Sequence, residues 1–440
     1  MLGLDEELRG GSLAEQVDLL VYGAGQLLTL AGEGTRCGRA MSELGLIADG
    51  AVAAAGGRII ATGHTSAMRS RYRAKREIDA HGSVVLPGFV DAHTHPVFAG
   101  SRQDEFEQRI AGATYLEIMA AGGGIMSTAR ATRCASPGKL LREARPRLAR
   151  MLASGTTIAE AKTGYGLNSA SEVASLQAIF ALNRAQPVEL VPTFLGAHAI
   201  PEEYAGREED YVDSIVHDML PAVLLAAESE RGGVGAARPF CDVFCDRGAF
   251  SLEQTRRILS AASALGMPLK VHADEFAHLG AARLAAELGA VSADHLLRTP
   301  VEDMEAMARA GVVAVLLPGT TFGLGQQEYA DARAMIAANL AVALGTDLNP
   351  GTCYCESMPL IMALACRYMR MTPAEALVAS TVNAAHALGR GADLGRLQPG
   401  YGADMLVLDT DDYRNLSYCF GSNLVRTVIK RGDVVFRAAD

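Results

Sequence analysis

The 440-residue sequence has no apolar run as long as the ~18 residues that a membrane-spanning helix needs. Residues 1–12 are acidic and lack the charged-then-apolar order of a signal peptide. The eight cysteines reach neither the density of a disulfide scaffold nor a Cys-x-x-Cys spacing. A formal net charge of −10 disfavours nucleic acid or an anionic membrane as a partner. These absences predict a cytoplasmic protein with reduced thiols that binds neither nucleic acid nor membrane.

The sequence does contain enough apolar material for a large folded core. Hydrophobic residues make up 49% of the chain and charged residues 20%, a balance typical of well-packed globular proteins. A chain of this length exceeds one ordinary core. We therefore expect either two domains or one large barrel with an added module.

Residues 87–389 read as a repeated alternation of strand and helix. Eight short β-rich runs precede helix-like segments, and eight such units in about 300 residues predict a (β/α)₈ barrel, a TIM-like α/β fold. A doubly wound open sheet is the alternative. The eight runs end near His95, Lys162, His198, Asp246, His272, His295, Pro318 and Asp347.

Helix starts in this region carry recognisable signals. Ser136-Pro137 predicts a helix that stops at Gly155, with proline at its first position. Three further starts have the spacing of a capping box, in which a Ser or Thr side chain and a Glu or Gln side chain exchange hydrogen bonds with the first turn. They are Ser251 with Gln254, Thr299-Pro300 with Glu302, and Thr372-Pro373 with Glu375.

The two ends of the chain differ from the middle. Residues 17–31 and 51–63 are strand-like, with two glycines at 56–57 in a hairpin position, and 403–408 and 424–437 are similar in style. Neither end has enough strands to bury a face alone. We therefore predict that 1–86 and 390–440 combine into one small β-sandwich domain beside the barrel.

An apolar run from Pro87 ends in His93-Thr94-His95. On a strand, residues two apart point to the same side, so both imidazoles share one face. Two such imidazoles can form half of a divalent metal site. A bare His-x-His is more often structural, so the pair needs support from elsewhere in the chain.

That support comes from the ends of later strands, where barrels of this kind carry functional residues. His272 follows the fifth predicted strand, His295 the sixth and Asp347 the eighth. Three imidazoles and one carboxylate suit one divalent ion, zinc or iron. We predict metal ligation by His93, His95, His272 and Asp347, and proton handling by His295.

Further polar residues are expected around the same axis. Arg102 could bind a substrate anion in a bidentate manner, although a surface salt bridge is the alternative. Glu275 could hold a ring nitrogen or relay a proton, and Asp347 could take a proton from a metal-activated water. Catalysis is thus assigned to His295, Asp347 and Glu275. The predicted substrate contacts are Arg102, Tyr165, His198, Glu275, Asn349, Gly351 and Thr352.

Motifs along nearly the whole chain resemble those of the metal-dependent amidohydrolase superfamily. The superfamily resemblance rests mainly on 93–102 and 346–351, and a narrower one rests on the motifs between them, at 112–115, 162–167, 194–198, 242–245 and 272–275. The motifs between them are similar to those of superfamily members that hydrolyse 4-imidazolone-5-propanoate to N-formimidoyl-L-glutamate in histidine degradation. The segment Cys353-Tyr354-Cys355 departs from the small polar residues common there.

The resemblance implies a barrel with a split β-sandwich, a homodimer, and the metal ligands and substrate contacts named above. It implies that His295 is the catalytic histidine. Two alternatives stay open. One is another cyclic amide or amidine hydrolase or deaminase of the superfamily, and the other is a non-catalytic scaffold on the same fold.

Overall fold

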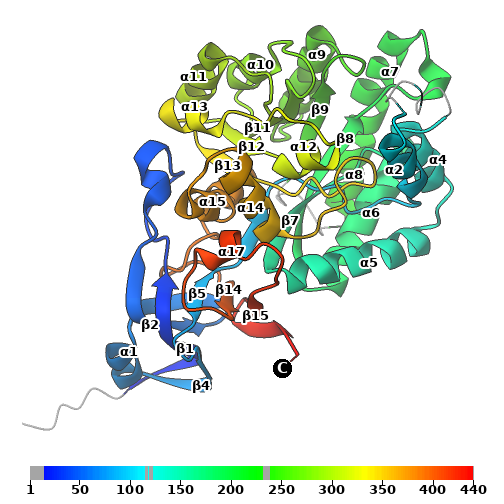
Figure 1. Cartoon of the computed structure of the whole chain (residues 1–440). Helices are drawn as coiled ribbons and strands as arrows, with labels where there is room; N and C mark the ends of the chain where they lie inside the picture. The colour runs from blue at the N-terminus through cyan, green and yellow to red at the C-terminus, as the bar shows by residue number, and fades with distance from the viewer. Residues whose placement is uncertain (1–13, 114–116, 118–121, 231–237, 440) are drawn as a thin grey trace, which may run out of the picture.

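The computed structural model describes residues 14–113, 117, 122–230 and 238–439. It consists of a barrel and a smaller β-domain in which the two ends of the chain, blue and red in Figure 1, lie together. The predicted fold class is confirmed. Among the described residues, no helix is both long enough and apolar enough to cross a membrane.

Eight short strands form the barrel and pair in chain order, all in parallel. The first and last strands approach each other where Thr94 bridges to Leu348, and the His95 amide donates to the Leu348 carbonyl at 2.8 Å. The sheet is therefore nearly closed, and the open-sheet alternative is wrong. The strands are β6 (Phe89–Asp91), β7 (Thr156–Lys162), β8 (Glu189–Ala197), β9 (Phe240–Cys245), β10 (Lys270–Ala273), β11 (Ser292–His295), β12 (Val313–Leu316) and β13 (Val342–Leu344).

Helices surround the barrel and bury one apolar face each against it, as α5 does with Leu148 and Met151. The longer ones are α2 (Gln103–Ile110), α4 (Ile125–Arg133), α5 (Pro137–Ala153), α6 (Ser169–Ala185), α8 (Leu220–Glu230), α9 (Leu252–Ala264), α10 (Ala281–Leu288), α11 (Val301–Ala310) and α14 (Met358–Tyr368). The shorter ones are α7 (Glu208–Ser214), α12 (Pro318–Gly323), α13 (Ala332–Ala337), α15 (Pro373–Ala379), α16 (Val382–Ala387) and α17 (Asn415–Tyr418).

All four predicted helices begin where the sequence places them, and three of the four predicted side-chain caps are confirmed. Ser136 accepts from the amide of Lys139 at the start of α5. Complete capping boxes begin α9, at Ser251, and α15, at Thr372. These caps form because both partners lie within one helical turn.

The capping box predicted at Thr299 is wrong. Pro300 is the residue that precedes α11, and it has no side-chain acceptor. The Thr299 hydroxyl instead donates to Asp274 Oδ2 at 3.0 Å. The Thr299 hydroxyl is therefore bound to the buried carboxylate of Asp274, at the end of another strand, and does not cap α11.

The terminal domain is a mixed sheet with strand order β16-β15-β14-β5-β1-β2-β3, and β4 pairs with the first half of β1. The ladder between β5 and β14 joins the two ends of the chain, and Leu27, Val85, Met405 and Ile429 share one core. The strands are β1 (Glu15–Leu28), β2 (Leu46–Ala55), β3 (Arg58–His64), β4 (Tyr72–Asp79), β5 (Val84–Pro87), β14 (Met405–Leu408), β15 (Val425–Lys430) and β16 (Asp433–Arg437), and helix α1 (Thr65–Arg71) follows β3.

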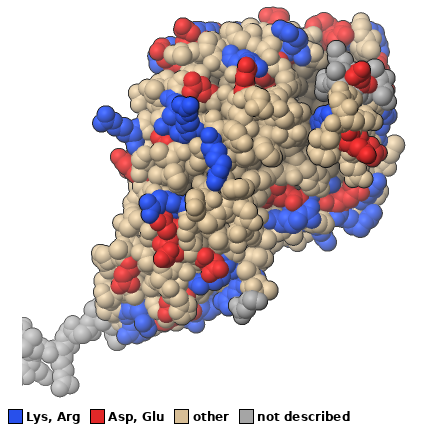
Figure 2. Space-filling view, in the orientation of Figure 1, with Lys and Arg blue, Asp and Glu red and all other residues tan. Residues whose placement is uncertain are grey.

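The predicted hairpin at 56–57 is confirmed between β2 and β3. The proposed boundaries near residues 86 and 390 stay a prediction, and residues 1–13 lie outside the described part of the chain. On the face seen in Figure 2, basic and acidic side chains are interspersed.

Candidate active site

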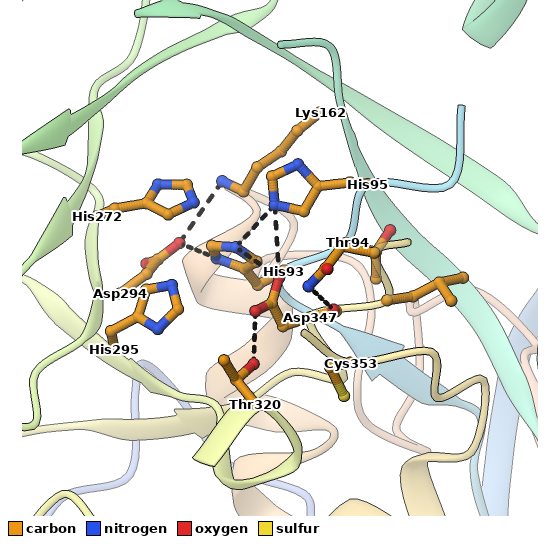
Figure 3. Close-up of polar contacts among 12 residues, drawn as sticks. His93, Thr94, His95, Lys162, His272, Asp294, His295, Thr320, Asp347 and Cys353 are labelled. Atoms are coloured by element: carbon orange, nitrogen blue, oxygen red, sulfur yellow. Dashed lines mark hydrogen bonds and ion pairs between the residues drawn. The ribbon is translucent and has the colours of Figure 1, made fainter. Parts of the chain in front are cut away.

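The strand β6 ends directly before His93 and His95, and both imidazoles are buried. Their Nε2 atoms lie 3.3 Å apart. Asp347 follows β13, and its Oδ1 lies 3.5 Å from His93 Nε2 and 3.4 Å from His95 Nε2. Figure 3 shows these three side chains converging on one point.

These separations fit a metal ion. With metal–ligand bonds of about 2.1 Å, the edge of a coordination tetrahedron is about 3.4 Å. His272, from β10, brings a third imidazole whose nitrogen lies within 4.8 Å of those of His93 and His95. The four predicted ligands are thus brought together. Burial lowers the pKa of His93 and of His95, so both rings are neutral, as metal ligation requires.

Carboxylates that the sequence reading did not assign lie behind two of these rings. Asp294 Oδ2 is 2.6 Å from His93 Nδ1, and Asp242 Oδ2 is 3.0 Å from His272 Nδ1. A signal for them exists in the sequence, because charged residues alternate with apolar ones inside otherwise buried strands, as in Glu160-Ala161-Lys162.

Most of the predicted substrate contacts line one pocket of about 110 Å³ beside this cluster. Gly351 lies outside it and lines a neighbouring cavity of about 430 Å³, which shares Arg102 and Thr352 with the pocket. The pocket is lined by His95, Arg102, Ile125, Tyr165, His198, Phe244, His272, Glu275, Phe276, His295, Asp347, Asn349 and Thr352.

Arg102 is mostly buried, which argues against the surface salt bridge considered for it. Its Nε and Nη2 donate to Glu105 Oε2 at 2.9 and 2.8 Å. Its Nη1 faces the loop at Gly351, where a Cβ atom would lie 2.1 Å from it. Glycine is therefore required at 351 for the guanidinium to pack against this loop.

His198 and Tyr165 are held by the loop that follows β7. His198 Nδ1 lies 3.0 Å from the Gly164 carbonyl, and its ring stacks on His95 with centroids 5.1 Å apart. Gly164 has φ +104°, and a Cβ there would lie 3.0 Å from His198 Nδ1. The glycine lets the loop approach the histidine closely.

Asn349 shapes the loop after β13 through its own side chain. Its Oδ1 accepts from the amides of Gly351 and Thr352, each at 2.8 Å, and its Nδ2 donates to the Asp347 carbonyl at 2.8 Å. Asn349 thereby holds Gly351 and Thr352 at the edge of the pocket.

Titratable groups in the pocket depart from their ordinary pKa values. Burial raises the pKa of Glu275 well above its usual range, and Asp347 adds to the effect. Burial lowers the pKa of His295 to about 3. The pocket therefore presents Glu275, whose protonated form burial favours, beside a neutral His295, whose Nε2 lies 3.7 Å from Glu275 Oε2.

Asp347 itself stays ionised. Burial by itself raises its pKa, but contacts with His95, His295 and Thr320 outweigh burial and lower it. The Thr320 hydroxyl donates to Asp347 Oδ2 at 2.5 Å. The site thus combines neutral imidazoles, an ionised carboxylate and a glutamate whose pKa is raised.

The family model described as the amidohydrolase family matches residues 84–435. A barrel with this cluster at the carboxyl ends of its strands is consistent with that match, and the chain belongs to the amidohydrolase family. Within it, the chain groups with the imidazolonepropionases. Imidazolonepropionase of Chloroflexus aggregans is 55% identical, over 96% of this chain and 99% of that protein. That of Herpetosiphon aurantiacus is 49% identical, over 96% of this chain and 97% of its own length.

Solved structures with the same fold are more distant in sequence. A zinc-bound adenosine deaminase of Xanthomonas campestris has a TM-score of 0.69 and 20% identity, over 96% of this chain and 93% of that chain. Guanine deaminase of E. coli has a TM-score of 0.70 and 15% identity, over 96% of this chain and 99% of that chain. At these identities the likeness concerns the fold alone.

Residues 114–115 of the motif at 112–115 lie outside the described residues. The departure at Cys353-Tyr354-Cys355 borders the larger cavity and does not line the pocket that holds the candidate metal ligands.

Proposed function

We propose that the chain is a metal-dependent hydrolase that opens the ring amide of 4-imidazolone-5-propanoate to form N-formimidoyl-L-glutamate. Relatives named imidazolonepropionase, 55% and 49% identical over nearly the whole chain, support this activity. The structural observation that carries it is one pocket with a metal-binding cluster and the Arg102 guanidinium in its lining. A ring amide with an anionic side chain needs both.

The proposed metal is one divalent ion, zinc or iron, held by His93, His95, His272 and Asp347. When bound, such an ion supplies Lewis acidity, which acidifies water and polarises a carbonyl group. Asp347 Oδ1 accepts the proton of the water that attacks the ring carbonyl carbon. The substrate, a small molecule, is the partner that this pocket accommodates.

The remaining residues bind and orient the substrate. Arg102 binds the propionate carboxylate, and neutral His295 donates an N–H to the carbonyl oxygen as that oxygen gains charge. Glu275, whose protonated form burial favours, donates a proton to the ring nitrogen as the amide bond breaks. Tyr165, His198, Asn349, Gly351 and Thr352 complete the proposed contacts.

The first alternative is a deaminase or another cyclic amide or amidine hydrolase, since solved neighbours include deaminases. Arg102 argues against a neutral base as substrate, because Glu105 contacts only the Nε and Nη2 edge of the guanidinium and a neutral base brings no negative charge to the rest of it. The second alternative, a non-catalytic scaffold, is disfavoured because the predicted ligand set is complete.

The deciding experiment measures metal content and activity on one purified sample. We expect about one zinc or iron per chain and loss of imidazolonepropionate absorbance, which a chelator abolishes and either ion restores. Guanine and cytosine serve as competing substrates. Turnover of either base in place of the imidazolone would refute the proposal. We also propose a homodimer and a cytoplasmic location, which sedimentation and fractionation test.

A further inference from the structure

Five charged side chains form a network beneath the candidate metal site, and the proposed reaction gives them no role. All five are fully buried, and they come from four of the eight barrel strands. They are Glu160 and Lys162 on β7, Asp242 on β9, Lys270 on β10 and Asp294 on β11. Burying three carboxylates and two ammonium groups costs free energy, so we expect the network to have a functional role.

Two of the carboxylates reach the proposed metal ligands from behind. Asp294 Oδ2 lies 2.6 Å from His93 Nδ1, and Asp242 Oδ2 lies 3.0 Å from His272 Nδ1. An ionised carboxylate in this position keeps the imidazole proton on Nδ1 and leaves the Nε2 lone pair for a metal ion.

Lys162 connects these two carboxylates. Its Nζ lies 2.5 Å from Asp242 Oδ2 and 3.6 Å from Asp294 Oδ2, and 3.0 Å from Glu160 Oε2. Figure 3 shows Asp294 linked to both Lys162 and His93. The Lys162 ammonium group therefore contacts the carboxylates behind both His93 and His272, which lie at the ends of different strands.

The main chain ties Lys162 to the same place. Its amide donates to the Thr94 carbonyl at 3.0 Å, between His93 and His95. Although burial by itself lowers the pKa of Lys162, the carboxylates of Asp242, Glu160 and Asp294 outweigh burial and raise it. The ammonium group thus stays charged at neutral pH.

Lys270 is not equivalent to Lys162. Its Nζ contacts Glu160 Oε1 and the Ala92 carbonyl, each at 3.0 Å, and it lies 3.8 Å from Asp294 Oδ2. Among the described residues, Lys162 is the one lysine that contacts Asp242. Without Lys162, the two buried carboxylates would repel each other and would no longer be held in place against the imidazoles.

We infer that Lys162 is a positioning residue for the metal site: its ammonium group holds the carboxylates of Asp242 and Asp294 in place, and through them orients the rings of His93 and His272. The inference rests on the metal site of the proposed function and not on the substrate. Replacing partners of this kind typically weakens metal affinity 10- to 100-fold.

The test compares Lys162→Met with Lys430→Met in the full-length protein. Lys430 is also nearly buried among carboxylates, 2.6 Å from Asp404 and 3.3 Å from Glu189, but it belongs to β15 of the terminal domain. We expect zinc affinity, measured by chelator competition, to fall about 10-fold or more in Lys162→Met only. The visible absorption of the cobalt-substituted protein should change in that variant as well.

If Lys162→Met does not fold, the double variant Lys162→Met/Glu160→Gln removes one charge of each sign and is expected to fold with the same weakened zinc affinity. Zinc affinity within twofold of the wild type, in either folded variant, overturns the inference. A wild-type protein that binds no divalent ion would refute the proposed metal site itself, so the two failures are distinguishable.

Discussion

At the scale of single residues, Arg102 combines burial with a charge that faces the candidate active site. Its side chain is 10% exposed, and Glu105 occupies only the Nε and Nη2 edge of the guanidinium. Nη1 lies over the loop at Gly351. This arrangement pre-orients the guanidinium, so that little side-chain entropy is lost when an anion binds.

Arg102→Ala should therefore raise KM about 10- to 100-fold, because a charge-assisted hydrogen bond contributes roughly 1.5–3 kcal/mol. A smaller change in kcat is expected, since Arg102 contacts the tail and not the reacting carbon. Steady-state kinetics on imidazolonepropionate measure both constants. Arg150→Ala is the control, because that arginine is 54% exposed and pairs with Glu356; equal KM values for the two variants would contradict the role of Arg102.

At the scale of elements, the loops after the strands carry the site, and buried side chains hold those loops. The carboxylate of Glu172, in the first turn of α6, accepts from the amides of Gly164, Gly166 and Leu167 at 3.0, 2.7 and 2.8 Å. These three bonds fix the loop that positions Tyr165. The rigidity of the pocket at this point thus comes from a helix and not from the loop itself.

Glu172→Gln should loosen this loop, because an amide has one acceptor oxygen where the carboxylate has two. We expect KM to rise about tenfold and the free energy of unfolding to fall by about 1–3 kcal/mol. Ser251→Ala is the matched control, since it removes the cap of α9 at a cost of about 1 kcal/mol without touching the pocket. A Glu172→Gln enzyme with unchanged KM would show that the loop does not depend on this carboxylate.

At the scale of the whole molecule, the barrel and the terminal domain are joined by an ionic cluster around Glu189. This residue begins β8, and it pairs with Arg390, with Lys430 Nζ at 3.3 Å and with Arg431 Nη2 at 3.1 Å. Lys430 is the last residue of β15, and Arg431 lies in the turn between β15 and β16. A barrel strand is thereby held to a hairpin from the far end of the chain.

The pH dependence of stability should report this cluster. Burial by itself raises the pKa of Glu189, but Lys430 and Arg390 outweigh burial and lower it to about 2. A lowered pKa stabilises the folded state above the unfolded pKa of about 4.3, and this stabilisation is lost as the pH falls toward 2. Glu189→Gln should therefore cost about 2–3 kcal/mol at pH 7 and much less at pH 3.

Urea unfolding of both proteins at pH 7 and pH 3 measures this difference. Asp433→Asn is the control, because Asp433 pairs with Arg76 at the surface and is 74% exposed, so its contribution should be under about 1 kcal/mol. An equal loss at both pH values would mean that Glu189 acts through packing and not through its charge.

The sequence predicted features whose determinants are local. The capping box at Thr372 was predictable because both of its partners lie within one turn, whereas Thr299 was misassigned because Asp274 lies 25 residues away. His93 and His95 were predictable because a period of two places them on one face. Glu105 and Glu172 were missed as supports of the pocket, since nothing local marks which distant amides or guanidinium groups they meet.

The order of strands and helices, the shared face of the first two histidines and the family of the chain were determined by the sequence itself, because periodicity and short motifs act over a few residues. Only the tertiary structure decided that Lys162, Asp242 and Asp294 meet behind the histidines. They come from three different strands, and closure of the barrel brings them together. Burial then makes each of these charges depend on the others, because water no longer solvates them.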